Sequence, residues 1–339
     1  MDQKFFQKSE YQGLRKLYQH SPRNSQQLNG FNGSDTEIVK IKKNLFLTGS
    51  TDSIAIEIHS KLYTNPETWG YLAVANSVSD LAASGTKPIG MLISAQWAQH
   101  HSGKVKDKVY KSTSNALNKF GVPLLGGDSG SSYATMLTTT ILGESNLKPL
   151  NRIGISPGDV VILFGRGLGY GPALAFDYLK NSSRKNFEPL FRPRPDWQTI
   201  YTFRKYFKSS IDTSDGIYNS LVTLSELNEV SFVVALRNLK LSKEIISFKN
   251  EFEIPTQYFI ESDLGDLQTC IVLDRSVYQK IKSKLPFHQM IACAEKKSVT
   301  PVRYADSVNQ RGYNTLPDIL EQTRFDYLKS LNRWLRQRP

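Results

Sequence analysis

Six aspartates of this 339-residue chain stand in or beside apolar segments, where a carboxylate is costly to bury. Asp80 interrupts the apolar helix expected over ANSVSDLAASG, and Asp128 follows two glycines directly after the strand-like PLL. Few Lys or Arg residues stand next to these positions, so the compensating charge must come from elsewhere. The six residues are Asp35, Asp52, Asp80, Asp128, Asp212 and Asp215.

A divalent cation is the simplest compensating charge for such a set. Mg²⁺ prefers hard oxygen ligands and bridges to phosphate oxygens. Taken singly, each aspartate could instead be a helix cap or a turn residue. Asp80 resists that explanation because it lies inside the expected helix, and Asp212 and Asp215 flank Ser214 at a spacing of three. The set as a whole predicts a polynuclear metal–phosphate site.

The segment DSIAIEIH alternates apolar and polar residues, which predicts a strand over 52–59. Asp52 begins this strand and His59 follows seven residues later. An odd spacing places two side chains on opposite faces of a regular strand. His59 would therefore not share a metal with Asp52, and it either faces a substrate or makes only a local hydrogen bond.

Two glycine-rich segments invite comparison with phosphate-binding loops. We expect PLLGG (123–127) to form a strand that leads into a glycine-rich turn, and the backbone N–H groups of GGDSGSS (126–132) could hold an anion. FGRGLGYGPAL (164–174) lies between a strand and a helix, as in dinucleotide-binding folds, but its spacing differs, and its only acidic candidate at about the right distance downstream is Glu188. NAD binding is therefore disfavoured. The sequence also lacks a Walker A motif, the common kinase motifs and the serine-hydrolase elbow.

The chain divides near residue 150, at the loop-like NRIGISPGD. We expect a helix and a flexible segment in 1–30, one domain over 31–150 and a second over 151–339. Strands and helices are mixed in each half, which indicates an α+β or mixed α/β architecture. The clearest expected elements are strands over 36–43, 44–49, 88–98, 134–144 and 160–165, and helices over 69–85, over 105–121 with Gly121 as C-cap, from 172 and from 317. The basic residues of the last helix are typical of a solvated face.

Composition limits the partners. The formal net charge of +12 favours anionic ligands, but the excess is spread over both halves, so nucleic acid is disfavoured. No segment resembles a membrane span or a secretory signal. The two cysteines, Cys270 and Cys293, exclude a disulfide framework and a Cys-based zinc cluster. These features fit a cytoplasmic protein.

Seven motifs, taken in order, resemble one ATP-dependent superfamily. It contains aminoimidazole ribonucleotide synthetase, selenophosphate synthetase, a hydrogenase-maturation dehydratase and thiamine-monophosphate kinase, and the kinase branch is the most similar. The motifs are GSDTEI, STDSIAIEIH, WGYLAVANSVSDLAASGTKP, LLGGDS, RIGISPGD, IDTSDGI and LGDLQTCIV. The resemblance implies a two-domain synthetase-like α+β fold. Its N-terminal domain would form a dimeric β-barrel-like interface with a second subunit, and its C-terminal domain would be mixed α/β.

The resemblance also implies ATP and Mg²⁺ as cofactors and a small-molecule acceptor. The implied metal ligands are Asp35, Ser50, Thr51, Asp52, Asp80, Asp128, Asp212 and Asp215. The implied ATP contacts are Gly127, Asp128, Arg152 and Ser214, with Asp212 and Asp215 as the catalytic pair. The implied acceptor contacts are His59, Asp266 and Tyr313.

Two departures from the kinase pattern are clear. Gly33-Ser34-Asp35 keeps only the second of two adjacent aspartates, and the family's G-E-D-Y-E-L-L becomes LGDLQTC (264–270), where Asp266 alone stays acidic. The part of the predicted site that would bind ATP and metal therefore matches the kinase motifs better than the part that would bind the acceptor. Three functions remain open: a kinase of the thiamine-monophosphate kinase type, an ATP-driven synthetase or dehydratase, and a non-catalytic nucleotide- or nucleic-acid-binding paralogue.

Overall fold

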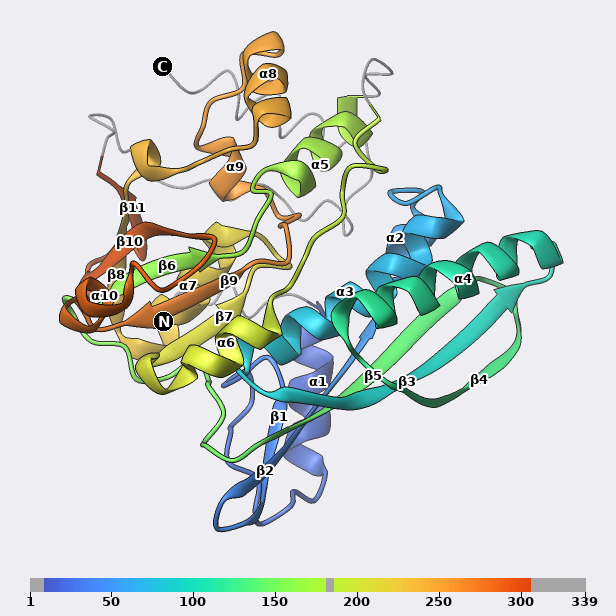
Figure 1. Cartoon of the computed structure of the whole chain (residues 1–339), viewed down its shortest axis with the longest axis horizontal. Helices are drawn as coiled ribbons and strands as arrows, with labels where there is room; N and C mark the ends of the chain where they lie inside the picture. The colour runs from blue at the N-terminus through green and yellow to red at the C-terminus, as the bar shows by residue number, and fades with distance from the viewer. Residues whose placement is uncertain (1–8, 181–185, 306–339) are drawn as a thin grey trace.

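The computed structural model describes residues 9–180 and 186–305, and its strands form two sheets, one from each half of the chain (Figure 1). The first sheet has the order β1-β2-β5-β3-β4 and the second β11-β8-β10-β6-β9-β7. The first sheet comprises β1 (Glu37–Lys42), β2 (Leu45–Ser53), β3 (Lys87–Ala98), β4 (Leu124–Ser132) and β5 (Met136–Ser145). The second comprises β6 (Val160–Phe164), β7 (Ser209–Asp212), β8 (Val230–Val234), β9 (Thr269–Leu273), β10 (His288–Lys296) and β11 (Val302–Tyr304). All pairings are antiparallel except β3 with β4 and β8 with β11.

Helices cover one face of the first sheet and surround the second (Figure 1). The first half contains α1 (Ser9–His20), α2 (Ala55–His59), α3 (Pro66–Ala83) and α4 (Gly103–Phe120). The second half contains α5 (Tyr170–Lys180), α6 (Trp197–Phe203), α7 (Ile217–Asn228), α8 (Lys243–Glu251), α9 (Tyr258–Glu261) and α10 (Arg275–Ile281). Across the described residues, no helix combines the length and apolar character that a bilayer span requires.

Helix α3 is the element that brings the two halves together. Asn65 caps its N-terminus by accepting a hydrogen bond from the backbone N–H of Glu67, and Pro66 occupies the first turn, where its missing N–H has no consequence. Its residues are buried on nearly every side, because α3 packs against β2, β5 and α4 of its own half and against α6, β7 and β9 of the other. A carboxylate on α3 can therefore face residues of the second sheet.

The prediction of a strand over 52–59 is wrong beyond its first residues. Strand β2 ends at Ser53, whose partner is Thr138, and the chain then turns into the short helix α2. The backbone N–H of Ser60 donates to the carbonyl of Ile56, and Ile54 is buried while Ile56 is 59% exposed. The N–H of Ile54 still donates to the Leu137 carbonyl at 3.2 Å, but β5 begins at Met136, so no strand remains to pair with 56–59. The alternation of isoleucines is overridden by the lack of a partner strand.

The strand predicted over 123–127 is confirmed as the start of β4, but the turn predicted after it is wrong, because 128–132 also lie within β4 and pair in parallel with β3. Gly127 is required there: a Cβ atom at this position would lie 2.1 Å from the carbonyl oxygen of Ile93. The boundaries of other helices and strands agree more closely with those predicted from the sequence. Gly121 ends α4 in the left-handed conformation at φ 65°, as predicted.

Candidate active site

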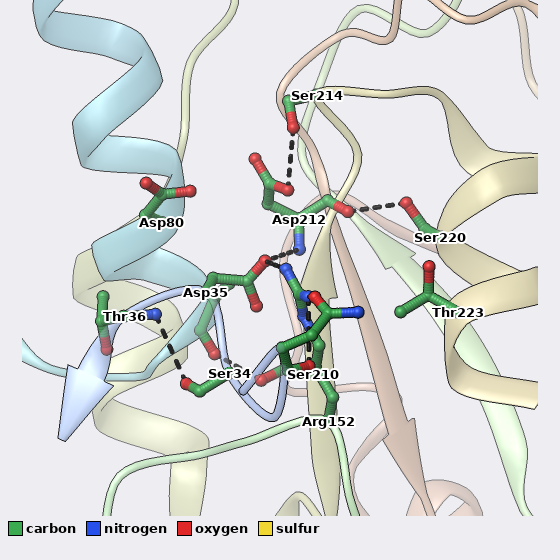
Figure 2. Close-up of polar contacts among 12 residues, drawn as sticks. Ser34, Asp35, Thr36, Asp80, Arg152, Ser210, Asp212, Ser214, Ser220 and Thr223 are labelled. Carbon is green, nitrogen blue, oxygen red and sulfur yellow. Dashed lines mark hydrogen bonds and ion pairs between the residues drawn. The ribbon is translucent and has the colours of Figure 1, made fainter. Parts of the chain in front are cut away.

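Three of the six aspartates converge where α3 meets the second sheet (Figure 2). Asp35 comes from the loop before β1, Asp80 from α3 and Asp212 from the end of β7. One carboxylate oxygen from each lies within 4.8 Å of the others. Segments that are far apart in the sequence thus place three hard oxygen ligands around one point, an arrangement that suits a divalent cation such as Mg²⁺.

Hydrogen bonds fix both carboxylate oxygens of Asp212. The hydroxyl of Ser79 on α3 donates to Oδ2 at 2.9 Å, and the hydroxyl of Ser214 donates to Oδ1 at 3.1 Å. The backbone N–H of Asp212 donates to Asp35 Oδ1 at 3.3 Å, and the Ser220 hydroxyl donates to the Asp212 carbonyl at 2.8 Å (Figure 2). These donors hold the carboxylate in one orientation while leaving lone pairs for a further ligand.

The raised pKa values of Asp212 and Asp80 indicate that the negative charge of this cluster is only partly compensated within the chain. Burial, together with the nearby Asp35, raises the pKa of Asp212 to about 8, although Ser79 and Arg152 act in the opposite direction. Burial also raises the pKa of Asp80 well above its usual range, and Asp52, Asp212 and Asp35 add to the effect. A divalent cation would neutralise several of these carboxylates at once, and its binding would release protons. The donor set therefore fits Mg²⁺.

Arg152 stands beside the three carboxylates and supplies the positive charge that the chain itself contributes. Its guanidinium forms an ion pair with Asp35 (Nη2 to Oδ1, 2.7 Å) and also contacts the side chain of Asn32. Its backbone is held by Gly33, which accepts from its N–H at 2.9 Å, and by Asn228, whose amide donates to its carbonyl at 2.7 Å. A guanidinium held this firmly can bind a phosphate oxygen with its remaining N–H groups.

A pocket opens from this cluster toward α7. It is lined by Asp35, Asp80, Arg152, Ile211, Asp212, Ser214, Asp215, Asn219, Ser220 and Thr223. Asp215 is close enough to Asp212 to raise its pKa, and the Asn219 amide donates to the Asp215 carbonyl at 2.9 Å. The sequence analysis missed Asn219, Ser220 and Thr223. They stand three, four and seven residues after Gly216, the end of the DTSDG motif, and this spacing marks one helical face that could have revealed them.

Strand alternation separates three neighbouring residues that the sequence analysis placed together. The hydroxyl of Ser50 donates to Asp80 Oδ2 at 2.5 Å, and Asp52 lies close enough to Asp80 to raise its pKa. The side chain of Thr51 faces away, with its hydroxyl 3.0 Å from that of Thr140. Successive side chains of a strand point to opposite faces. The structure thus brings Ser50 and Asp52 to the cluster but not the Thr51 side chain.

Asp128 also lies on the sheet face that is turned away from α3. It pairs with Ser94 of β3 and accepts a hydrogen bond from the Gln96 amide at 3.0 Å. The alternate residues of β3, such as Ala95 and Trp97, are the buried ones that pack beneath α3 and α4. The structure therefore does not bring Asp128, or the adjacent backbone of Gly127, to the three converging carboxylates.

The predicted acceptor contacts are scattered. His59 is exposed at the end of α2, and Tyr313 lies outside the described residues. Asp266 is buried, and its two oxygens accept from the backbone N–H groups of Gly169 and Gly171 at 2.6 and 2.7 Å. Burial raises the pKa of Asp266 to about 7.

Asp266 therefore caps the N-terminus of α5, the place that a pyrophosphate occupies in dinucleotide-binding folds. Glu188 is likewise committed, because it accepts hydrogen bonds from the backbone of Thr64 and Asn65 and from the Thr64 hydroxyl. The N–H groups of Gly169 and Gly171 in the glycine-rich loop thus bind Asp266 of the same chain, an arrangement that does not favour NAD binding.

Comparison with known proteins places this arrangement among ATP-dependent enzymes. Residues 33–145 match the family described as AIR synthase related protein, N-terminal domain. The thiamine-monophosphate kinase of Prochlorococcus marinus is 30% identical over 225 residues, which is 60% of this chain and 67% of that protein. The enzyme of the same name from Buchnera aphidicola of Acyrthosiphon pisum is 28% identical over 260 residues, covering 74% of this chain and 78% of that protein.

Solved structures share the fold. AaThiL complexed with AMPPCP and TMP superposes with a TM-score of 0.75 at 21% identity, covering 92% of this chain and 97% of that one. At this level of identity the likeness concerns the fold. It agrees with the expected mixed architecture built from two α+β halves.

Proposed function

Because this chain belongs to the thiamine-monophosphate kinase family, we propose that it transfers the γ-phosphoryl group of ATP to a small-molecule acceptor with the help of Mg²⁺. One observation carries the proposal: Asp35, Asp80 and Asp212, from three distant segments, converge within 4.8 Å beside the guanidinium of Arg152. Phosphoryl transfer depends mainly on positioning and charge neutralisation, and this cluster is built for both.

In this proposal Asp35, Asp80 and Asp212 hold Mg²⁺, with Ser50, Asp52 and Asp215 at the edge of the same site. Bound Mg²⁺ supplies positive charge against the phosphate oxygens and aligns them for in-line attack. Arg152 binds a phosphate oxygen directly. Ser79 and Ser214 keep the Asp212 carboxylate in the orientation that the metal requires. Thr51 and Asp128 are left out of the set because their side chains face the other side of the first sheet.

We propose thiamine monophosphate as the first acceptor to test, because the relatives are named for it. His59 remains a candidate acceptor contact, being exposed on α2. Asp266 is not one, because the N-terminus of α5 uses both of its oxygens.

We extend the proposal to a homodimer in which a second copy covers the bare face of the first sheet. That face carries apolar side chains in solvent: Leu92 is 41% exposed and Met136 39% exposed. Exposed apolar side chains on one sheet face are typical of an interaction surface. A cytoplasmic location also belongs to the proposal, and its support is that Cys270 and Cys293 are both free thiols.

The test is to incubate the purified protein with ATP, Mg²⁺ and thiamine monophosphate, and to measure ADP, free phosphate and product mass together. We expect ADP and a product one phosphoryl group heavier than the acceptor. Asp80→Asn should slow formation of this product by about 10²-fold or more, whereas Asp107→Asn, at an exposed carboxylate of α4, should not. ADP released with an equal amount of free phosphate would instead indicate a synthetase or dehydratase. No ATP turnover with any acceptor would indicate a non-catalytic paralogue.

A further inference from the structure

Three cationic side chains surround Tyr71, far from the carboxylate cluster. Tyr71 lies nine residues before Asp80 on α3, roughly 13 Å along the helix axis. Lys119, in the last turn of α4, donates from Nζ to the Tyr71 hydroxyl at 3.0 Å and lies 4.8 Å from the ring centroid. The guanidinium of Arg192 lies 5.5 Å from the same centroid, and Arg194 is close enough to act electrostatically on Lys119 and Tyr71.

This cluster sits at a well-defined junction of α3, the end of α4 and the loop before α6 (Figure 1). The indole N–H of Trp197 donates to the Phe120 carbonyl at 2.8 Å, which ties the loop to the end of α4. The Tyr71 hydroxyl donates to the Pro193 carbonyl at 2.7 Å. Contacts with Tyr71 thus place Lys119 and Arg192, and Arg194 is exposed on the adjoining loop one residue after Pro193.

No carboxylate forms an ion pair with Lys119, Arg192 or Arg194 in the part of the chain that the structure describes. The Arg192 guanidinium donates instead to the carbonyls of Glu188 and Phe191 and to the Thr68 hydroxyl, which are all uncharged acceptors. Glu67 and Glu188 act on Arg192 at longer range.

The repulsion among these cations is visible at Lys119. Burial lowers the pKa of its ammonium group, and Arg194 and Arg192 lower it further. A bound multivalent anion would reverse this effect, because an opposite charge at hydrogen-bonding distance favours the protonated amine.

We propose that Lys119 and Arg194, supported by Arg192, bind a phosphate group. Lys119 retains two N–H donors after its bond to Tyr71, and a guanidinium offers two parallel donors to an oxyanion. A tetrahedral dianion matches this combination of point charge and fork better than a carboxylate does. The site shares no residue with the carboxylate pocket and requires no metal.

The test uses the full-length protein in a chelator, where the unneutralised carboxylates of the active site repel anions. Titration calorimetry with orthophosphate, pyrophosphate and glycerol 2-phosphate should show one saturable site. Lys119→Gln and Arg194→Gln should each weaken binding about tenfold or more, as expected for loss of a charge-assisted hydrogen bond. Lys108→Gln, at an exposed position of the same helix, is the matched control and should bind like the wild type. Tighter binding of the ester than of orthophosphate identifies a phosphorylated metabolite as the ligand, and the reverse identifies free phosphate.

A second readout separates this site from the active site. NMR titration of the Lys119 side chain should show its pKa rising when phosphate is added, in the wild type and in Lys108→Gln alike. The proposal is overturned if the wild type binds none of the three anions at millimolar concentration. It is equally overturned if phosphate binding survives Lys119→Gln and Arg194→Gln but is lost in Arg152→Gln, because the anion would then occupy the carboxylate pocket.

Discussion

Replacing Asp212 by Asn should stabilise the metal-free protein against unfolding, even though it should damage catalysis. Burial and the neighbouring Asp35 raise the pKa of this carboxyl from 3.8 to about 8 in the folded protein. A tenfold change in an ionisation constant corresponds to about 1.4 kcal/mol, so at pH 7 the upper limit of the destabilisation is about 4 kcal/mol. Asn removes the charge but keeps only one acceptor for Ser79 and Ser214. We therefore expect a net gain of about 1–3 kcal/mol in the free energy of unfolding.

The sign of the pH dependence follows from the raised pKa. The contribution of Asp212 to stability is fully present below its unfolded pKa near 3.8, and it is lost as the pH rises through the folded value of about 8. In a chelator, the wild type should lose stability between these values, and Asp212→Asn should lose less. Mg²⁺ at a hundred times its Kd should raise the free energy of unfolding of the wild type by about 2.7 kcal/mol. It should raise that of Asp212→Asn by less.

Urea denaturation at pH 5, 6, 7 and 8, with chelator and with Mg²⁺, measures all of these quantities. Asp107→Asn is the matched control, since it removes an exposed carboxylate of α4 without touching the cluster. The reasoning is refuted if Asp212→Asn is no more stable than the wild type in chelator at pH 8, or if the two proteins show the same slope with pH.

Four further changes test other parts of the account. Asp80→Asn should lower kcat by about 10²-fold or more, measured at saturating ATP over a range of Mg²⁺ concentrations; an unchanged kcat would remove Asp80 from the metal site. Arg152→Gln should raise KM for ATP about tenfold through the lost phosphate contact, and an effect on kcat alone would contradict that role. Asp266→Ala leaves the buried N–H groups of Gly169 and Gly171 without a hydrogen-bond acceptor, so it should lower the free energy of unfolding by about 1–3 kcal/mol. Weaker binding of the substrate at unchanged stability would argue against the capping role. Leu92→Glu should convert the proposed homodimer to a monomer in sedimentation velocity, and a wild type that sediments as a monomer would contradict that part of the proposal.

Much of the first half could be predicted from local patterns. The apolar segment over 69–85 predicts a helix, and α3 lies there at 66–83, beginning three residues earlier at Pro66. The end of α4 follows from Gly121. The failures at 52–59 and at GGDSGSS have one cause. Whether a segment pairs as a strand depends on a neighbour far away in the sequence, such as β5 for β2 and β3 for β4.

Prediction of the site is limited in the same way, by contacts between residues far apart in the sequence. The sequence identified aspartates in positions where burial is costly, and three of them do meet. It could not tell which face of a strand each side chain occupies, so Thr51 and Asp128 were grouped with residues that the sheet separates from them. Nor could it foresee that Asp266 would cap α5 or that Asp35 would pair with Arg152, because both contacts join segments about a hundred residues apart.

Binding of Mn²⁺ as a substitute for Mg²⁺, followed by electron paramagnetic resonance with and without a non-hydrolysable ATP analogue, tests the carboxylate cluster most directly. The wild type should bind the ion more tightly when the analogue is present, and Asp80→Asn and Asp212→Asn should lose most of that binding. Equal binding of Mn²⁺ by the wild type and by both variants would mean that these carboxylates do not hold the metal against the nucleotide.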